Sequence, residues 1–187
     1  MANVNHNTLS DPYLHEPKGV ATALAGQVYL ADGAASGDWV YDHRQVGGYI
    51  SFSTGAPYTH AATTSDSVLN PTLTLVGNSG FTGLTSPNTR IRYDGTTSIV
   101  ASLTASFSIQ QTSGSGKDVE LVFYKNGSEL TGSRMITSST TAEWHNITIA
   151  FNTTLATNDY IEVFSKISSA ATVSYAAGYI RILGVPA

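Results

Sequence analysis

Hydrophobic and polar side chains alternate along most of the chain after residue 46, and residues 98–111 show the pattern most clearly. Even positions from 98 to 110 are polar except for Val100, and the odd positions hold Ile99, Ala101, Leu103, Ala105, Phe107 and Ile109. A period of two belongs to a strand, because successive side chains of a strand point to opposite faces. We therefore expect a long strand here, with one face in a core and the other in water or against another subunit.

The same alternation returns in residues 147–151, and residues 160–164 form another apolar segment. Residues 152–159, which join the two, are too polar to continue a strand and too few for a crossover helix. The sequence therefore predicts two strands that are antiparallel neighbours in one sheet.

Further strands are expected at 49–52, 71–76, 89–93, 119–124, 173–176 and 179–183. Asn126 and Gly127 predict a tight hairpin after residue 125, because these residue types accept the positive φ angles of a type I′ turn. Residues 53–67 and 79–88 are expected to be long polar loops. About nine or ten strands without a helix indicate an all-β fold, an antiparallel sandwich or a barrel.

We expect residues 46–187 to form one domain. Residues 1–45 differ from it in the pattern and size of their side chains. Pro12 and Pro17 favour an extended segment, and short strands are expected at 27–30 and 38–41 around an Asp32-Gly33 turn. This region has too few large apolar side chains to form a core of its own, so we interpret it as an arm. The arm is either a loose tail or expression remnant, or a segment that orders on a partner through its apolar anchors Tyr13, Leu14, Tyr29, Leu30 and Trp39.

Composition and charge narrow the classes of partner. Hydrophobic residues make up 41% of the chain, enough for a core, whereas charged residues make up only 12%, so the surface is polar with few charges. The formal net charge is -4 and no basic stripe exists, which argues against nucleic acid and anionic membranes as partners. Since the sequence shows neither a secretory signal nor a run of apolar residues that could span a bilayer, we expect synthesis in a host cytoplasm.

Residues that could carry catalysis or hold a metal form no recognisable pattern. Cysteine is absent, and the five histidines lack metal-binding spacing, although three copies of one histidine could meet on a threefold axis. Gly114-Ser115-Gly116-Lys117 lacks the first glycine of a phosphate loop, and Asp118 follows where serine or threonine should bind magnesium. We therefore expect no enzyme activity, no cofactor and no metal.

The order of these signals resembles the jelly roll of the tumour-necrosis-factor and complement-globular-head superfamily. In that family an alternating strand precedes a hairpin that ends in Asn-Gly, and a later turn ends in Gly-Asp or Asn-Asp before a Tyr-x-Glu-Val strand. Residues 98–107, 119–127, 155–163 and 179–182 follow this order, with Asn158 where glycine is usual. The resemblance covers roughly residues 70–185 and implies an antiparallel jelly-roll sandwich preceded by the arm.

The arm resembles N-terminal segments of tailed-phage structural proteins, above all head-decoration and head-fibre proteins, over residues 11–20, 26–33 and 36–39. Together the two resemblances imply a bacteriophage capsid decoration (cement) protein. It would form a homotrimer on the capsid exterior of the virion, bind the major capsid protein through the arm and stabilise the head. The aromatic side chains expected at the trimer interface or its rim are Phe123, Tyr124, Tyr160, Phe164, Tyr175 and Tyr179.

Two other functions remain open. A receptor- or glycan-binding fibre head would use Trp39, Trp144 and loop tyrosines to stack on sugar rings of the host surface. A tail or neck component would be present in a few copies per particle, whereas a decoration protein would be present in tens to hundreds.

Overall fold

The computed structural model describes residues 27–33, 36–41, 46–72, 74–78, 80–83, 89–113, 116–141 and 143–187. The chain divides into two compact units, residues 1–43 and 44–187. In the first unit, β1 (Gln27–Gly33) and β2 (Ser36–Tyr41) pair antiparallel, with Tyr29 opposite Trp39, so the two short strands expected in the arm are confirmed. The predicted anchors Tyr13 and Leu14 lie outside the described residues.

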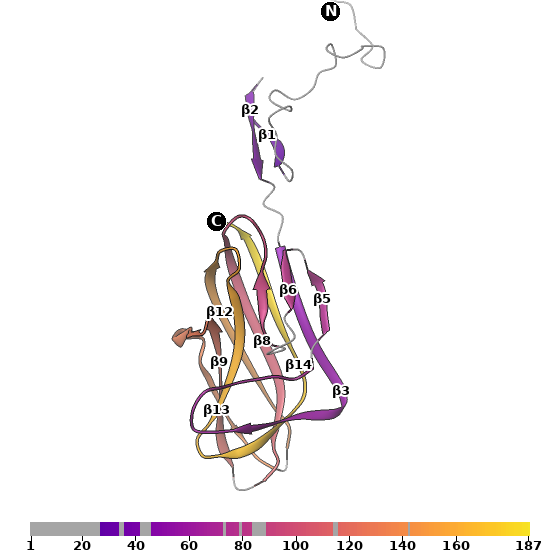
Figure 1. Cartoon of the computed structure of the whole chain (residues 1–187), viewed down its shortest axis with the longest axis vertical. Coiled ribbons are helices and arrows are strands. Elements are labelled where there is room, and N and C mark those ends of the chain that lie inside the picture. The colour runs from indigo at the N-terminus through magenta and orange to yellow at the C-terminus, as the bar shows by residue number, and fades with distance from the viewer. Residues whose placement is uncertain are drawn as a thin grey trace, which may run out of the picture. The chain divides into compact units, whose positions relative to one another are not determined.

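The second unit is a sandwich of two antiparallel sheets (Figure 1), which confirms the all-β fold. One sheet has the order β12-β8-β14-β3-β5, with bounds His145–Leu155, Ile99–Gln111, Ala171–Pro186, Val46–Ala62 and Thr74–Asn78. The other has the order β10-β9-β13-β7-β6, with bounds Ser128–Glu129, Lys117–Lys125, Tyr160–Ile167, Ile91–Tyr93 and Phe81–Gly83. To this second sheet β11 (Met135–Ser139) adds on β9, and β4 (Ser67–Val68) adds on β13.

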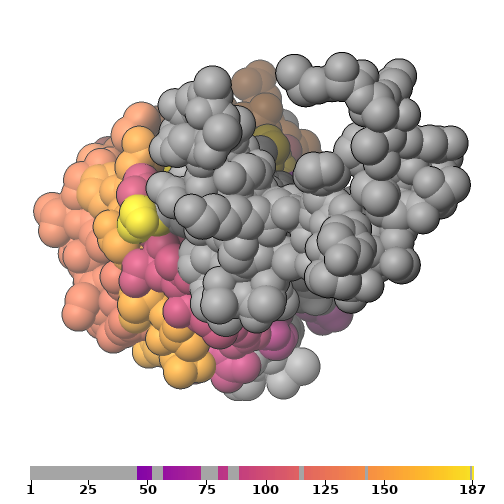
Figure 2. Space-filling model, turned by 90° about the horizontal axis from the view of Figure 1, so that it is seen from above, coloured from indigo at the N-terminus to yellow at the C-terminus, as the bar shows by residue number. Residues whose placement is uncertain are grey.

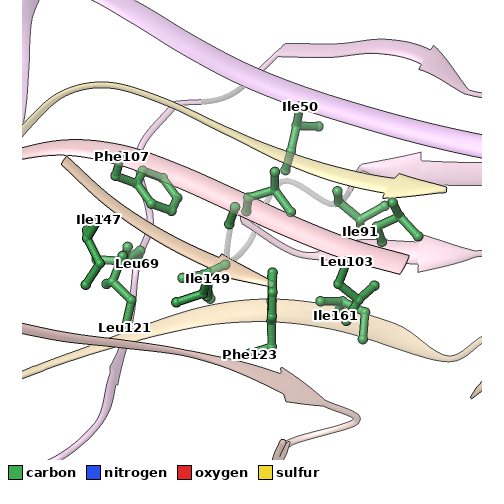
Figure 3. Packing of buried hydrophobic residues seen from close by; sticks show 14 of the residues in the cluster. Ile50, Leu69, Ile91, Leu103, Phe107, Leu121, Phe123, Ile147, Ile149 and Ile161 are labelled. Carbon is green, nitrogen blue, oxygen red and sulfur yellow. The ribbon is translucent and has the colours of Figure 1, made fainter. Parts of the chain in front are cut away.

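The core lies between the two sheets and is built by the alternation seen in the sequence. Every odd position of β8 from Ile99 to Gln111 is buried, whereas the even positions are exposed or half-buried. Figure 3 shows the side chains that meet between the sheets, among them Leu103, Phe107, Leu121, Phe123, Ile147, Ile149 and Ile161. The predicted strand at 98–111 is therefore confirmed, together with its buried face.

The turn signal at Asn126-Gly127 is also confirmed. Both residues have positive φ angles, 50° and 76°, and Ser128 pairs with Lys125 across the turn. Glycine takes this conformation without the steric cost that a Cβ would bring.

The two strands around residues 152–159 are not neighbours in one sheet, so that prediction is wrong. β12 pairs with β8 from His145↔Ile109 to Leu155↔Ile99, whereas β13 pairs with β9 in the other sheet. The short turn that crosses between the sheets places Asn158 at a φ of 71°. Both strands direct one apolar face into the same core, and this pattern is identical whether two strands lie side by side or face each other across the core.

β3 is much longer than the sequence indicates. It continues to Ala62 because β14 pairs with it from Gly184↔Val46 to Ala171↔Ala62, so most of the predicted loop at 53–67 is strand. The C-terminal segments predicted as two strands are the single strand β14, with a register irregularity between Tyr175 and Ala177. Of the predicted loop at 79–88, β6 occupies residues 81–83. Residues 131–133 add a single 3-10 turn to a unit expected to have no helix.

The C-terminal end of β14 is tied to the start of β8. The backbone N–H of Ala187 donates a 2.9 Å hydrogen bond to the carbonyl oxygen of Ser98. In the end-on view of Figure 2 these C-terminal residues, in yellow, lie against magenta and orange segments of the sandwich.

Phe123→Ala should lower the free energy of unfolding by about 3–5 kcal/mol, because the ring is fully buried between the sheets and its loss leaves a cavity. Chemical denaturation at one fixed protein concentration measures the change. Ser128→Ala, at an exposed position on β10, is the matched control and should change stability by less than about 0.5 kcal/mol. Equal stability of the two variants would contradict the buried position of Phe123.

Candidate functional site

The candidate functional site is the face of the five-stranded sheet that points away from the core, and we call it the outer face. Its residues follow from the register: the even positions of β8 point away from the core, and so do the residues paired with them on β12 and β14. Successive rows across β12, β8 and β14 are Asn146–Ser108–Ala177, Thr148–Ser106–Tyr179, Ala150–Thr104–Arg181, Asn152–Ser102–Leu183 and Thr154–Val100–Val185. On β3, Ser51 lies beside Tyr179 and Tyr49 lies beside Arg181.

The outer face is almost free of charge. Among the outward positions of β8, β12 and β14 in these rows, Arg181 is the one charged residue, and the others are small, hydroxylated, amide or apolar. Desolvating a charged group costs much more free energy than desolvating a hydroxyl or a methyl group. This face can therefore be covered by another protein at low electrostatic cost.

Two hollows open on the outer face. The first has a volume of about 450 Å³ and is lined by Tyr49, Ser51, Ser106, Phe107, Ser108, Asn146, Ala177, Gly178 and Tyr179; we call it the tyrosine hollow. Its aromatic side is formed by Tyr49 and Tyr179, whose ring centroids are 5.7 Å apart. On the opposite side, Ser108 donates a 2.8 Å hydrogen bond to the amide oxygen of Asn146. The second hollow, of about 400 Å³, is more apolar and is lined by Val100, Ala101, Ser102, Asn152, Leu183, Gly184 and Val185.

Large hydrophobic side chains that remain exposed in the described part of the chain fall into two groups. Val100 and Val185 belong to the outer face. Met135 and Ile136 lie on β11, and Trp144 lies just before β12. β11 pairs only with β9 among the described strands, so it is an edge strand, and we call Met135 and Ile136 the β11 edge. Val100 and Val185 are paired across β8 and β14, and contiguous exposed apolar groups on a soluble domain are typical of interaction sites.

The six predicted interface aromatics do not form one surface. Phe123 and Tyr175 are 0% exposed within a single chain, so they belong to its core and have no surface left for a second subunit. Burial raises the pKa of the Tyr175 hydroxyl well above its usual value, and that hydroxyl donates a 2.9 Å hydrogen bond to Ser165. The prediction is therefore corrected for these two residues.

The other four predicted aromatics are half-buried and lie on two different sheets. Tyr124 stacks on Phe164 with centroids 3.9 Å apart, and the guanidinium of Arg90 lies 4.2 Å from the Tyr160 ring centroid, all on the seven-stranded sheet. Tyr179 alone lies on the outer face. The sequence did not predict a role for Tyr49, Met135 or Ile136. The outer face itself could have been inferred from the alternation in β8 and the outward position of Tyr179.

The seven-stranded sheet carries an ion-pair network instead of an uncharged surface. Arg134 contacts three carboxylates, at 2.6 Å for Asp66 and 2.9 Å for both Glu120 and Glu129. Tyr124 donates a 2.7 Å hydrogen bond to Asp66, whose pKa is lowered chiefly by its hydrogen bonds from Arg134. The pKa of Tyr124 is raised to about 12 by burial and by the hydrogen bond to Asp66. Because Arg134 directly precedes β11, this network holds the first residues of β11 in place.

The shifted ionisable groups all have structural partners. Asp94 and Asp159 have lowered pKa values and form ion pairs with Arg92 at 2.5 Å and Lys125 at 2.8 Å. Burial lowers the pKa of His60, whose Nε2 lies 2.8 Å from the Ser67 hydroxyl. Ion pairs of this kind perturb pKa values without any catalytic role.

Within the stretches that the structure describes, no three metal-ligating side chains gather at one point. The same stretches contain no helix with the length and apolar character needed to cross a membrane.

No protein-family model matches the sequence, and no curated protein matches it. Solved structures do match. The structure of Eiger, a TNF from S. frugiperda, has a TM-score of 0.52 and 10% identity over 75% of this chain and 92% of that chain. Murine APRIL at pH 8.5 has a TM-score of 0.48 and 14% identity over 75% and 99%, and the PRD1 vertex protein P5 has 0.46 and 14% over 75% and 96%. The likeness to Eiger establishes the fold as a TNF-like jelly roll.

Arg134→Met should cost about 1–3 kcal/mol of stability at neutral pH, because it leaves three partly buried carboxylates without their shared donor. Arg92→Met removes a more exposed pair and should cost less than about 1 kcal/mol. Chemical denaturation of the two variants under identical conditions measures the difference. A smaller loss for Arg134→Met than for Arg92→Met would show that the network contributes little.

Asp66 should also make stability depend on pH. Since its pKa is lower in the folded protein than the ordinary 3.8, its stabilisation is present above that pH and is lost as the pH falls through the folded-state value. Asp66→Asn should therefore show a shallower loss of stability on acidification below about pH 5 than the unmodified protein. Parallel denaturation curves at stepped pH values test this, and identical slopes for the two proteins would contradict it.

Proposed function

We propose that this protein is a structural protein of a virus particle, a bacteriophage capsid decoration protein that attaches to the capsid exterior as a trimer through its N-terminal unit. The observation that carries the proposal is the division of the chain. The jelly-roll unit has its own complete core, whereas the described strands of the first unit form a sheet of only two strands. An isolated two-stranded hairpin is marginally stable in water, so it gains most from a partner surface.

Attachment through the hairpin has a defined physical form. β1 and β2 pair with no other strand among the described residues, so each presents unpaired backbone groups along one edge. Such edges are the elements by which an extended segment adds to a partner sheet. The major capsid protein is the partner that we propose, on the basis of the resemblance of residues 11–20, 26–33 and 36–39 to phage head-decoration and head-fibre segments.

The uncharged outer face supports self-association of the jelly-roll unit. A stable interface buries about 1,600 Å² in total and has few charges at its centre. The outer face, with Arg181 as its one charge over the five rows described above, has this composition. Three arms on one trimer would bind the capsid roughly 10² to 10⁴ times more tightly than one arm, without any new type of contact.

A glycan-binding fibre head is the second candidate, and the tyrosine hollow favours it. Its paired rings and its serine and asparagine side chains are the groups that stack on and hydrogen-bond to sugars. The two functions compete for the same surface, because a face covered by a neighbouring subunit cannot hold a sugar. Clear hits on a glycan array, all lost in Tyr179→Ala, together with no binding to capsids, would favour the fibre head.

Deleting residues 1–43 should leave a folded jelly roll that no longer binds capsids, because the remaining chain starts before β3 and retains the whole sandwich. Co-sedimentation with capsids that lack the protein measures binding, and circular dichroism with light scattering checks fold and oligomeric state. Capsid binding by the shortened protein at the same level as by the full chain would contradict an attachment role for the arm.

The number of copies on purified particles separates decoration from a tail or neck role. A decoration protein that follows the capsid lattice should be present in tens to hundreds of copies, measured by gel densitometry against the major capsid protein. A value near that of a single portal or tail ring would refute decoration while leaving a virion role in place.

A further inference from the structure

A histidine occupies a core-facing position near the end of β3. In this part of the strand Tyr58, His60 and Ala62 are buried or half-buried, whereas the residues between them are exposed. The His60 ring lies at 75° to the fully buried ring of Tyr175, with the two centroids 6.5 Å apart. A charge at such a position costs free energy unless an acidic group pairs with it, so the site favours the neutral ring.

Hydrogen bonds determine which nitrogen of His60 carries the proton. Ser67 donates its hydroxyl proton to the carbonyl oxygen of Ser165 at 3.2 Å, so it can only accept from His60 Nε2, which lies 2.8 Å away. Nε2 therefore holds the proton, and Nδ1 of the neutral ring accepts from the Tyr58 hydroxyl at 3.3 Å. The Tyr58 oxygen in turn accepts the Asn70 N–H at 3.1 Å. We call this chain of hydrogen bonds the His60 relay.

The relay binds the segment that carries the chain from one sheet to the other, residues 63–70, which we call the crossover. The crossover follows the edge of β13. The Ile167 N–H donates to the carbonyl oxygen of Thr63 at 2.9 Å, β4 pairs with β13, and the Leu69 N–H donates to the carbonyl oxygen of Val163 at 3.0 Å. The Leu69 side chain is 0% exposed. The relay therefore holds a segment that both covers a strand edge and fills part of the core.

The charged groups of the crossover and of β13 are bound elsewhere. Asp66 forms its ion pair with Arg134 at 2.6 Å, and Lys166 lies 3.4 Å from Glu120. None of the ion pairs among the described residues includes His60. Neither element therefore supplies a carboxylate that would stabilise a protonated ring.

The strands on the other side of His60 are uncharged at this end of the sandwich. Residues 171–176 of β14 and 107–111 of β8 contain no acidic or basic side chain. The titratable group that β14 brings to the ring is the Tyr175 hydroxyl, which donates to Ser165. Burial therefore acts without compensation, and it lowers the pKa of His60 from its ordinary value of 6.5.

Protonation of Nδ1 disrupts the relay. The new N–H group of His60 points at the Tyr58 oxygen, which already accepts the Asn70 N–H, and the Tyr58 proton loses its acceptor. The charge is also half-buried without a counter-ion. Both costs disappear when residues 67–70 move away from β3 and water reaches the ring.

The pH range of this effect follows from the direction of the pKa shift. Because the pKa of His60 is lower in the closed structure than 6.5, the open form binds the proton first as the pH falls. The stabilisation by the neutral ring is complete above pH 6.5 and is lost as the pH falls from 6.5 toward the closed-state value. Asp66, with a pKa below 3.8, keeps its bond to Arg134 throughout this range, so loosening begins after residue 66.

We propose that His60 is an acid-sensitive switch whose neutral ring holds residues 67–70 against β13 and whose protonation loosens them. Loosening uncovers the Leu69 side chain and leaves backbone groups of β13 without their partners. The switch lies within the jelly-roll unit and goes beyond the proposed virion function, on which it does not depend.

Hydrogen–deuterium exchange of the full chain at pH 7.5 and 5.5, corrected for the intrinsic effect of pH on exchange, measures the loosening. One linked proton raises the opening constant by up to about tenfold for each pH unit below 6.5. Exchange of residues 67–70 should therefore rise by several-fold to about tenfold at pH 5.5, whereas residues 103–109 of the β8 core should not change. An equal rise in both segments, or no rise in residues 67–70, would overturn the switch.

Substitution of the ring separates it from other acid effects. His60→Gln retains hydrogen-bonding groups but cannot take up a proton, so the rise at pH 5.5 should disappear. His145→Gln is the matched control, because His145 is a half-buried histidine on β12, three strands away from β3 in the same sheet. This variant should keep the full rise. A rise that persists in His60→Gln, or that is lost in His145→Gln, would contradict the assignment to His60.

NMR titration of the unmodified protein labelled with ¹⁵N-histidine gives a readout that does not depend on a variant. The His60 signals are identified by the contact of this ring with Tyr175. They should show the Nε2–H tautomer at pH 7.5 and a titration midpoint below 6.5. The Nδ1–H tautomer, or a midpoint at or above 6.5, would refute the switch.

Discussion

The pairing of β14 with β8 on one side and with β3 on the other is the interaction on which the rest of this structure depends. β14 is the central strand of the five-stranded sheet, and it pairs with both neighbours along nearly its whole length. The pairs between β14 and β3 join residues from opposite ends of the jelly-roll unit, so their formation closes the sandwich around its core. The pairs on both sides of β14 place Tyr179 beside Ser106 and Arg181 beside Tyr49, which creates the outer face. Stability and the candidate site therefore share one origin.

A single extra residue in β14 decides which tyrosine is buried. Tyr175 and Tyr179 are four positions apart, and in a regular strand they would point to the same side. The register shift between Tyr175 and Ala177 reverses the alternation, so Val173 and Tyr175 face the core before it and Ile180 and Ile182 face the core after it. Tyr175 is thereby enclosed in the sandwich and Tyr179 is left outside. A bulge that re-aims a side chain at an interaction surface is a recurrent use of this irregularity.

The fold class was predictable from the sequence because its main signals are local. The alternation in residues 98–111 and the Asn126-Gly127 turn each depend on residues within one element, and both are present as expected. The prediction that residues 147–151 and 160–164 lie in one sheet was wrong. Alternation shows which face of a strand is buried, but it does not show which strand lies beside it in the sheet. The length of β3 was missed for the same reason, since its second half is held by the distant β14. Phe123 and Tyr175 are buried because of strand register and, for Tyr175, because of the bulge. Neither cause can be inferred from the mere presence of an aromatic residue in the sequence.

The order of the strands has a consequence for synthesis. The ribosome makes β14 after every other strand of the two sheets, yet β14 occupies the middle of its sheet. Until it emerges, β8 and β3 have no common neighbour, and Tyr49 and Ser106 belong to separate pieces of chain. Since domains fold as the chain leaves the ribosome, the outer face is completed only when β14 pairs with β8 and β3. A chain without β14 lacks the part of that surface that holds Ala177, Tyr179 and Arg181.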